Sequence, residues 1–238
     1  METSTVHVNF SRPVPVFPLR GVVLLPHALV PLHVFEPQYR QMLQHTLDGS
    51  GLIAMAVLAE DKSDFLDAVG KPPIRPVVCL GRVAQHERLP DGRYNILLQG
   101  VCRSRICEDV PPKGDRLYRM ALLEPIEPIV ASDAQSSEPR GVRNRLQRLL
   151  SEPPLSGLVL AEGVCGYLQQ DGKPLEVVLE LVGMSVASDN QVRYRLLEEP
   201  RAVKRARIIE DELHALRALL RKASPQLDPD APKGVVWN

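Results

Sequence analysis

Short apolar runs broken by prolines fill the first half of the chain. The first of them, residues 14–39, reads VPVFPLRGVVLLPHALVPLHVFEPQY. A proline lacks the amide hydrogen and clashes inside a helix, so this segment cannot be helical before Pro37. Its density of Val, Leu and Phe is typical of buried chain, and Phe17 and Phe35 are expected to fill the core. We therefore predict short strands, with each proline at a strand start, an edge or a bulge.

More strands follow, with one helix among them. Residues 37–47 have helical spacing of apolar side chains and begin at a proline, which the first turn of a helix tolerates. Gly81 predicts a bulge, and Leu89-Pro90-Asp91-Gly92 is typical of a hairpin turn. The predicted strands are residues 14–19, 30–35, 52–58, 76–88, 93–100, 101–106 and 117–123.

After residues 131–133 the apolar period changes from two to about 3.6, which predicts a bundle of helices. Gly163 and Gly166 indicate close helix packing, and residues 188–191 have the S-x-x-Q form of a capping box. The clearest helix is predicted over residues 201–222. The expected parts are a flexible arm (1–12), a β-rich domain (13–126), a helical bundle (127–223) and a flexible tail (224–238).

Composition narrows the range of partners and compartments. The 238 residues include 29 basic and 29 acidic side chains, so the formal net charge is zero, whereas nucleic-acid-binding proteins are usually strongly basic. The N-terminal residues lack the apolar run of a secretory signal, and no run approaches the about 20 apolar residues that span a bilayer. We expect a cytoplasmic protein without membrane contact. The four cysteines form no C-x-x-C pair and are interpreted as reduced, mostly buried thiols.

The sequence shows none of the common catalytic motifs for binding phosphate, dinucleotide or zinc, or for placing a nucleophile. We predict no catalytic residue, no cofactor and no metal. Cys102 and Cys107 lie an odd number of residues apart, hence on opposite faces of a strand. His33 is either a half-buried histidine bonded to backbone or a polar group that lines a cleft. Glu36 precedes a predicted helix and is expected to cap it.

Three segments together resemble the N-terminal substrate-binding domain of the Lon protease family. They are VFPL at 16–19 with VLLP at 23–26 and PLHVFEPQY at 31–39, then DGRYNILLQG at 91–100 with RSRI at 103–106, and LLEE at 196–199. The resemblance covers residues 13–222. It implies an α+β fold: a PUA-like β pseudo-barrel with a short helix, followed by a C-terminal helical bundle. Its structural signature falls on Phe17, Pro18, Leu19, Phe35, Glu36, Tyr39, Gly92, Arg93, Tyr94 and Gly100.

The resemblance also implies a function. Such a domain binds unfolded or peptide segments of other proteins, here as a non-enzymatic module that resembles the stand-alone bacterial form without ATPase or peptidase modules. An adaptor role in protein quality control, beside a separate protease, follows from the same resemblance. Two residues depart from the family pattern. Gln38 stands where arginine is usual, and Ser104 where an aromatic residue is common.

Binding residues are expected in the exposed turn within 24–31 and on the strand after it: Leu24, Leu25, Pro26, His27 and His33. The loop 59–76 and the junction 124–133 are further places for a groove. The alternative is an RNA-binding PUA-like module that uses Arg82, Arg103, Arg105 and the basic residues of 204–207. Neutral charge and an aromatic content of only 4% argue against it. A hydrolase would need a cleft where a serine or cysteine meets a histidine.

Overall fold

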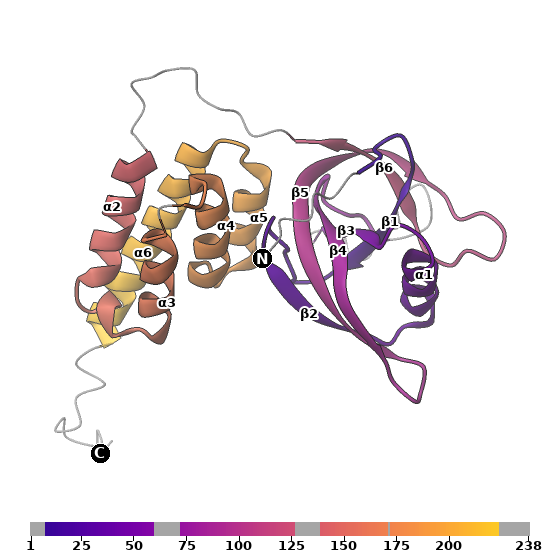
Figure 1. Cartoon of the computed structure of the whole chain (residues 1–238), viewed down its shortest axis with the longest axis horizontal. Helices are drawn as coiled ribbons and strands as arrows, with labels where there is room; N and C mark the ends of the chain where they lie inside the picture. The colour runs from indigo at the N-terminus through magenta and orange to yellow at the C-terminus, as the bar shows by residue number, and fades with distance from the viewer. Residues whose placement is uncertain (1–7, 60–71, 127–138, 171, 224–238) are drawn as a thin grey trace, which may run out of the picture. The chain divides into compact units, whose positions relative to one another are not determined.

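The computed structural model of the chain describes residues 8–59, 72–126, 139–170 and 172–223. These residues divide into two compact units (Figure 1). One contains the described residues up to Val130 together with Ser188–Ala202, and the other contains those of Ala131–Ala187 with those from Val203 onward. The predicted tail, and the parts of the predicted loop and junction at 60–71 and 127–133, lie outside the described residues.

The β unit contains one six-stranded sheet, a short helix and one helix from later in the chain. The sheet order is β2-β5-β4-β3-β1-β6. The long strand β5 pairs with β2 along its first half and with β6 along its second, and β6 also pairs with β1. The ring β1-β3-β4-β5-β6 is therefore closed, which confirms the α+β fold with a β barrel (Figure 1). The elements of this unit are β1 (Val14–Leu19), β2 (Leu29–Val34), α1 (Pro37–Leu47), β3 (Leu52–Val57), β4 (Val77–Arg88), β5 (Tyr94–Val110), β6 (Met120–Pro125) and α5 (Asn190–Glu198).

Strand β3 is buried on both faces. All six of its residues are buried, as its unbroken apolar sequence predicts. Parallel β1 and antiparallel β4 flank it. Val8 and Phe10 pack against the same core, so this part of the expected flexible arm is held by hydrophobic contacts. Phe17 is buried as expected, whereas Phe35, the residue after β2, is 57% exposed and does not fill the core.

Two glycines allow strands to approach neighbouring segments of the protein closely. The ladder between β4 and β5 shifts register at Gly81, where a bulge was predicted. A Cβ atom at Gly81 would lie 2.9 Å from the side chain of Leu98. At Gly100 a Cβ atom would lie 2.1 Å from the carbonyl oxygen of Leu25, a distance that no side chain can adopt. Gly100 is therefore required where the 24–28 turn crosses β5.

Prolines interrupt the hydrogen-bonding edge of β1. The amide of Val16 donates to the carbonyl of Arg119 over 3.0 Å, on the side of the strand away from β3. Backbone groups alternate sides along a strand, so the nitrogen of Pro18 faces the same way. Pro18 has no hydrogen to donate there, and the edge of β1 beyond Val16 lacks an amide donor at this position.

The free edge of β2 is interrupted in the same way. The carbonyl of Ala28 accepts from the Gly100 amide over 2.9 Å, so the backbone groups of Ala28 face β5. By alternation those of Val30 and Leu32 also face β5, and those of Pro31 face the open edge. A proline at an outward-facing amide is one of the devices that discourage edge-to-edge pairing of sheets.

The helix α1 begins at Pro37 and ends at Leu47, as predicted. Glu36 occupies the N-cap position with extended backbone, but its side chain makes no capping hydrogen bond. Its carboxylate instead accepts from the side-chain amide of Gln38 over 2.7 Å. The expected capping role of Glu36 is therefore not realised.

The helix α5 packs on the barrel, although its sequence position lies among the bundle helices. Tyr194 is buried, and its hydroxyl accepts the amide of Val77 at the start of β4 over 3.0 Å. The guanidinium of Arg75 lies 3.3 Å above the centre of the Tyr194 ring. Asp189, not Ser188, caps the helix by accepting from the amide of Gln191. The position of α5 in the β unit differs from the expected domain boundary, which placed all of 127–223 in the helical bundle.

The helical unit is built from α2 (Pro139–Ser151), η2 (Leu155–Gly157), α3 (Val159–Leu168), α4 (Leu175–Val186) and most of α6 (Ala202–Ala223). A buried ion pair joins two of these helices. Glu180 of α4 and Arg205 of α6 are both 2% exposed, with Oε1 and Nε 3.1 Å apart. Gly163 and Gly166 have no atom within 4 Å of an added Cβ, so they do not mark the close packing that was expected. No helix in the described ranges has the length and hydrophobicity needed to cross a bilayer.

Candidate functional site

The structure separates the predicted binding residues into two groups. Leu24, Leu25 and Pro26 are buried, because the turn that carries them folds over Gly100 and places their side chains in the core. Their side chains cannot meet a ligand directly. His27 is exposed at the tip of the turn with φ of 63°, and its amide donates to the Gly100 carbonyl over 2.9 Å. His33 is exposed on β2.

Strand β2 presents alternate side chains to solvent, as the two-residue period of a strand requires. Leu29 is 53% exposed, and Pro31 and His33 are exposed as well. Across the strand pair, Pro31 lies opposite Leu97 and His33 opposite Asn95. We call this surface the outer sheet face, and it consists of Leu29, Pro31, His33, Phe35, Asn95 and Leu97. The sequence pattern marked the prolines and His33, but the exposure of Leu29 and Phe35 emerges only from the fold.

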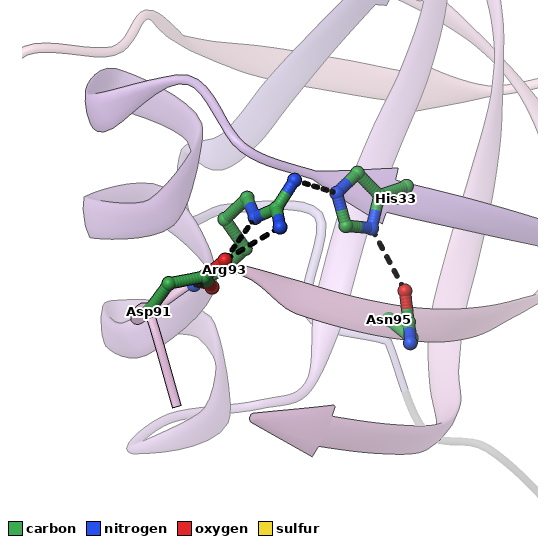
Figure 2. Close-up of polar contacts among 4 residues, drawn as sticks. All are labelled: His33, Asp91, Arg93 and Asn95. Atoms are coloured by element: carbon green, nitrogen blue, oxygen red, sulfur yellow. Dashed lines mark hydrogen bonds and ion pairs between the residues drawn. The ribbon is translucent and has the colours of Figure 1, made fainter. Parts of the chain in front are cut away.

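A chain of polar contacts, which includes His33 and Asn95, forms the polar border of the outer sheet face (Figure 2). His33 Nδ1 lies 2.8 Å from the Asn95 side-chain oxygen, and His33 Nε2 lies 3.4 Å from a terminal nitrogen of Arg93. A guanidinium only donates, so Nε2 accepts and the proton of the neutral ring lies on Nδ1. On its other side, Arg93 Nε donates to Asp91 over 2.6 Å. Phe35 stacks near His33, with ring centroids 6.1 Å apart.

The charges in this border are paired with one another. Hydrogen bonds from the Arg93 side chain and amide hold the pKa of Asp91 below its ordinary value, and the same carboxylate raises the pKa of Arg93. Both side chains are about half exposed, so solvent screens the pair. The border is thus a polar rim with little net charge beside an apolar strip, an arrangement that suits binding of a mixed polypeptide surface.

A second feature of the β unit is a cavity of about 420 Å³ next to β1 and the start of α1. Apolar side chains and two tyrosine rings form most of its wall. The lining residues are Val16, Pro18, Leu19, Arg20, Glu36, Gln38, Tyr39, Leu58, Pro72, Leu117, Tyr118 and Arg119. The sequence could have pointed to this cavity only through its motif residues in 16–19 and 36–39, because the other walls come from distant segments.

Two arginines proposed for the RNA alternative have structural roles. Arg103 is buried and donates to the carbonyls of Leu196 and Leu197. Arg205 is buried in its ion pair with Glu180. Neither guanidinium is exposed to a phosphate backbone. Among the described residues, no group of three or more His, Cys, Asp or Glu side chains is arranged to hold a metal ion.

Comparison with known proteins identifies the family. The sequence model of the ATP-dependent protease La (LON) substrate-binding domain matches residues 13–215. The chain belongs to the LON substrate-binding domain family. The resemblance seen in the sequence is thereby confirmed, together with its α+β fold.

Relatives of the LON family include complete proteases and isolated domains. The Lon protease of Azorhizobium caulinodans is 26% identical over 208 residues, which cover 85% of this chain and 23% of that protein. The Lon protease of Xanthomonas oryzae pv. oryzae is 31% identical over 137 residues, or 58% of this chain and 15% of that protein. The chain thus spans about a quarter or less of the length of these proteases.

Solved structures of LON domains share the fold. The N-terminal domain of Mycobacterium avium complex Lon protease has a TM-score of 0.63 at 19% identity, covering 85% of this chain and 98% of that domain. The Lon N-terminal domain protein from Xanthomonas campestris has a TM-score of 0.54 at 19% identity, covering 88% and 98%.

Proposed function

We propose that this chain is a non-enzymatic binding module that takes exposed, unfolded segments of other proteins onto the outer sheet face. The observation that carries the proposal is the match to a substrate-binding domain family, in a chain whose β unit exposes Leu29 and Phe35 beside a polar rim. Large apolar side chains left in solvent at one place on a soluble protein favour an interaction surface.

The edges of the sheet favour side-chain contacts over strand addition. A peptide that joins a sheet as an extra strand needs regularly spaced donors and acceptors along the edge. Pro31 on β2 and Pro18 on β1 each remove one outward donor. A bound segment is therefore expected to lie across the outer sheet face, with its apolar side chains against Leu29, Phe35 and Leu97.

The proposed setting is the cytoplasm, where the module would pass captured segments to a separate protease. This role follows from the family name and from the relatives, which are proteases that contain such a domain. The RNA-binding alternative loses two of its basic residues, because Arg103 and Arg205 are committed to internal contacts.

The test measures binding of this chain to a carboxymethylated, permanently unfolded model protein. The fluorescence anisotropy of the model protein is recorded as this chain is added. The double variant Leu29→Ser/Phe35→Ser is expected to bind about tenfold more weakly or worse, because two exposed apolar anchors are lost. Leu219→Ser is the matched control, since Leu219 is 63% exposed but belongs to α6 of the helical unit. Absence of binding by the unaltered chain at high micromolar concentration, or equal binding by all three proteins, would contradict the proposal.

A further inference from the structure

The cavity beside β1 shares no lining residue with the outer sheet face. Its volume of about 420 Å³ lies within the range of roughly 300–1,000 Å³ typical of ligand pockets. Val16, Pro18, Leu19, Leu58 and Leu117 give it an apolar wall.

Aromatic packing and a buried guanidinium hold the cavity in shape. The rings of Phe17 and Tyr39 lie 4.7 Å apart, which fixes Tyr39 against β1. Arg119 is only 4% exposed, and its guanidinium donates to both carboxylate oxygens of Asp109 over 3.2 and 3.0 Å and to the carbonyl of Pro72 over 3.2 Å. The positive charge of Arg119 is therefore neutralised within the wall.

Glu36 brings a carboxylate to the wall of the cavity. Its half-buried carboxylate accepts from Gln38, which is a neutral amide, and within the described part of the chain no cation lies at ion-pair distance from it. Arg20 also lines the cavity, but its exposed side chain is solvated. A half-buried carboxylate with a neutral partner attracts a cation more strongly than a solvated charge repels it, because its field is less screened.

We infer that this cavity receives one bulky apolar side chain of a bound polypeptide, and that Glu36 selects segments with a lysine or arginine next to that side chain. This inference rests on the proposed function and specifies part of its substrate preference. The missing donor at Pro18 fits insertion of a side chain rather than pairing of a strand at this edge. The apolar wall supplies affinity, and the carboxylate supplies sequence preference.

The test uses four short unstructured peptides that are identical except at two adjacent positions: Phe-Lys, Phe-Gln, Ser-Lys and Ser-Gln. The unaltered chain is expected to prefer Phe-Lys over Phe-Gln by about fivefold, the scale of one partly screened ion pair. Glu36→Gln should abolish this preference for lysine and keep the preference for phenylalanine. Leu117→Trp, at a half-exposed wall position, should fill the cavity and abolish the preference for phenylalanine.

The control variant is Glu108→Gln, which removes an exposed carboxylate on β5 and should leave both preferences unchanged. Circular dichroism checks that each variant is folded. Binding of all four peptides with equal affinity, or a lysine preference that survives Glu36→Gln, overturns this inference while the proposed function stands. If the unaltered chain binds neither the peptides nor the unfolded model protein, both the inference and the proposed function are overturned.

Discussion

Arg103 and Leu197 lie 94 residues apart in the chain, yet Arg103 Nε donates to the carbonyl oxygen of Leu197 over 3.1 Å. A second nitrogen of the same guanidinium donates to the carbonyl of Leu196 over 3.0 Å. These carbonyls belong to the last turn of α5, where backbone acceptors have no partner within the helix and a cation is favourable. A strand residue of the barrel therefore caps a helix from the far end of the sequence.

Replacement of Arg103 is expected to weaken the packing of α5 on the barrel. Arg103→Met keeps much of the buried volume but leaves two buried carbonyls without their donors, at a cost of about 2–4 kcal/mol. Hydrogen exchange of the α5 amides should accelerate before that of β3. Arg105→Met, at an exposed position two residues along β5, is the control and should change exchange little. Unchanged α5 protection in Arg103→Met would contradict this account of the capping.

The buried ion pair of the helical unit should respond differently to single and paired changes. Glu180→Ala removes the carboxylate that forms an ion pair with buried Arg205, and breaking such pairs costs about 3–5 kcal/mol. The paired change Glu180→Leu/Arg205→Met should restore most of that loss, since no buried charge remains. Arg145→Ala breaks the more exposed pair with Glu210 and should cost less than about 1 kcal/mol. Urea unfolding followed by circular dichroism measures all three. A double variant no more stable than Glu180→Ala would refute the argument.

Two glycines should respond in opposite ways to alanine. Gly100→Ala forces a Cβ atom against the Leu25 carbonyl and is expected to destabilise by about 3 kcal/mol, because neither backbone can yield easily. Gly163→Ala lies in α3 with open space around the new methyl, so it should stabilise by about 0.5–1 kcal/mol through helix propensity. Thermal unfolding compares each variant with the unaltered chain, and a stabilised Gly100→Ala would show that the close approach is not as described.

Alkaline pH should destabilise the β unit. Burial is the main cause that raises the pKa of Tyr39, Tyr118 and Tyr194 above the ordinary value of 10.0. The unfolded chain therefore releases these protons at lower pH than the folded chain. Their contribution to stability is complete below about pH 10 and is lost as pH rises through the folded pKa values. Urea midpoints measured at pH 9 and pH 11 report the loss.

A single variant isolates one of these tyrosines. Tyr39→Phe should lose less stability between pH 9 and pH 11 than the unaltered chain, because it has one buried phenol fewer to ionise. Tyr167→Phe is the control, because Tyr167 is 37% exposed, and it should behave as the unaltered chain does. An equal loss in all three proteins would remove Tyr39 from the explanation.

Local patterns in the sequence determined most of the elements. Proline excluded helix before residue 37 and allowed α1 to begin there, unbroken apolar sequence marked β3, and the Asp91-Gly92 turn marked the hairpin between β4 and β5. These signals act within a few residues, so they can be interpreted without knowledge of the fold. The motif spacing of residues 16–39 and 91–106 also identified the family.

Only the tertiary structure decided which side chains are available for binding. Leu24, Leu25 and Pro26 looked like an exposed turn but are buried, because Gly100 lets their backbone approach β5. Phe35 looked like core but is exposed. The placement of α5 on the barrel depends on Arg103 and Tyr194, whose partners are distant in sequence. The periodicity of the sequence indicates which residues share a face of a strand or helix. Whether another segment covers that face depends on long-range contacts. Such contacts determine which residues form the outer sheet face and the cavity.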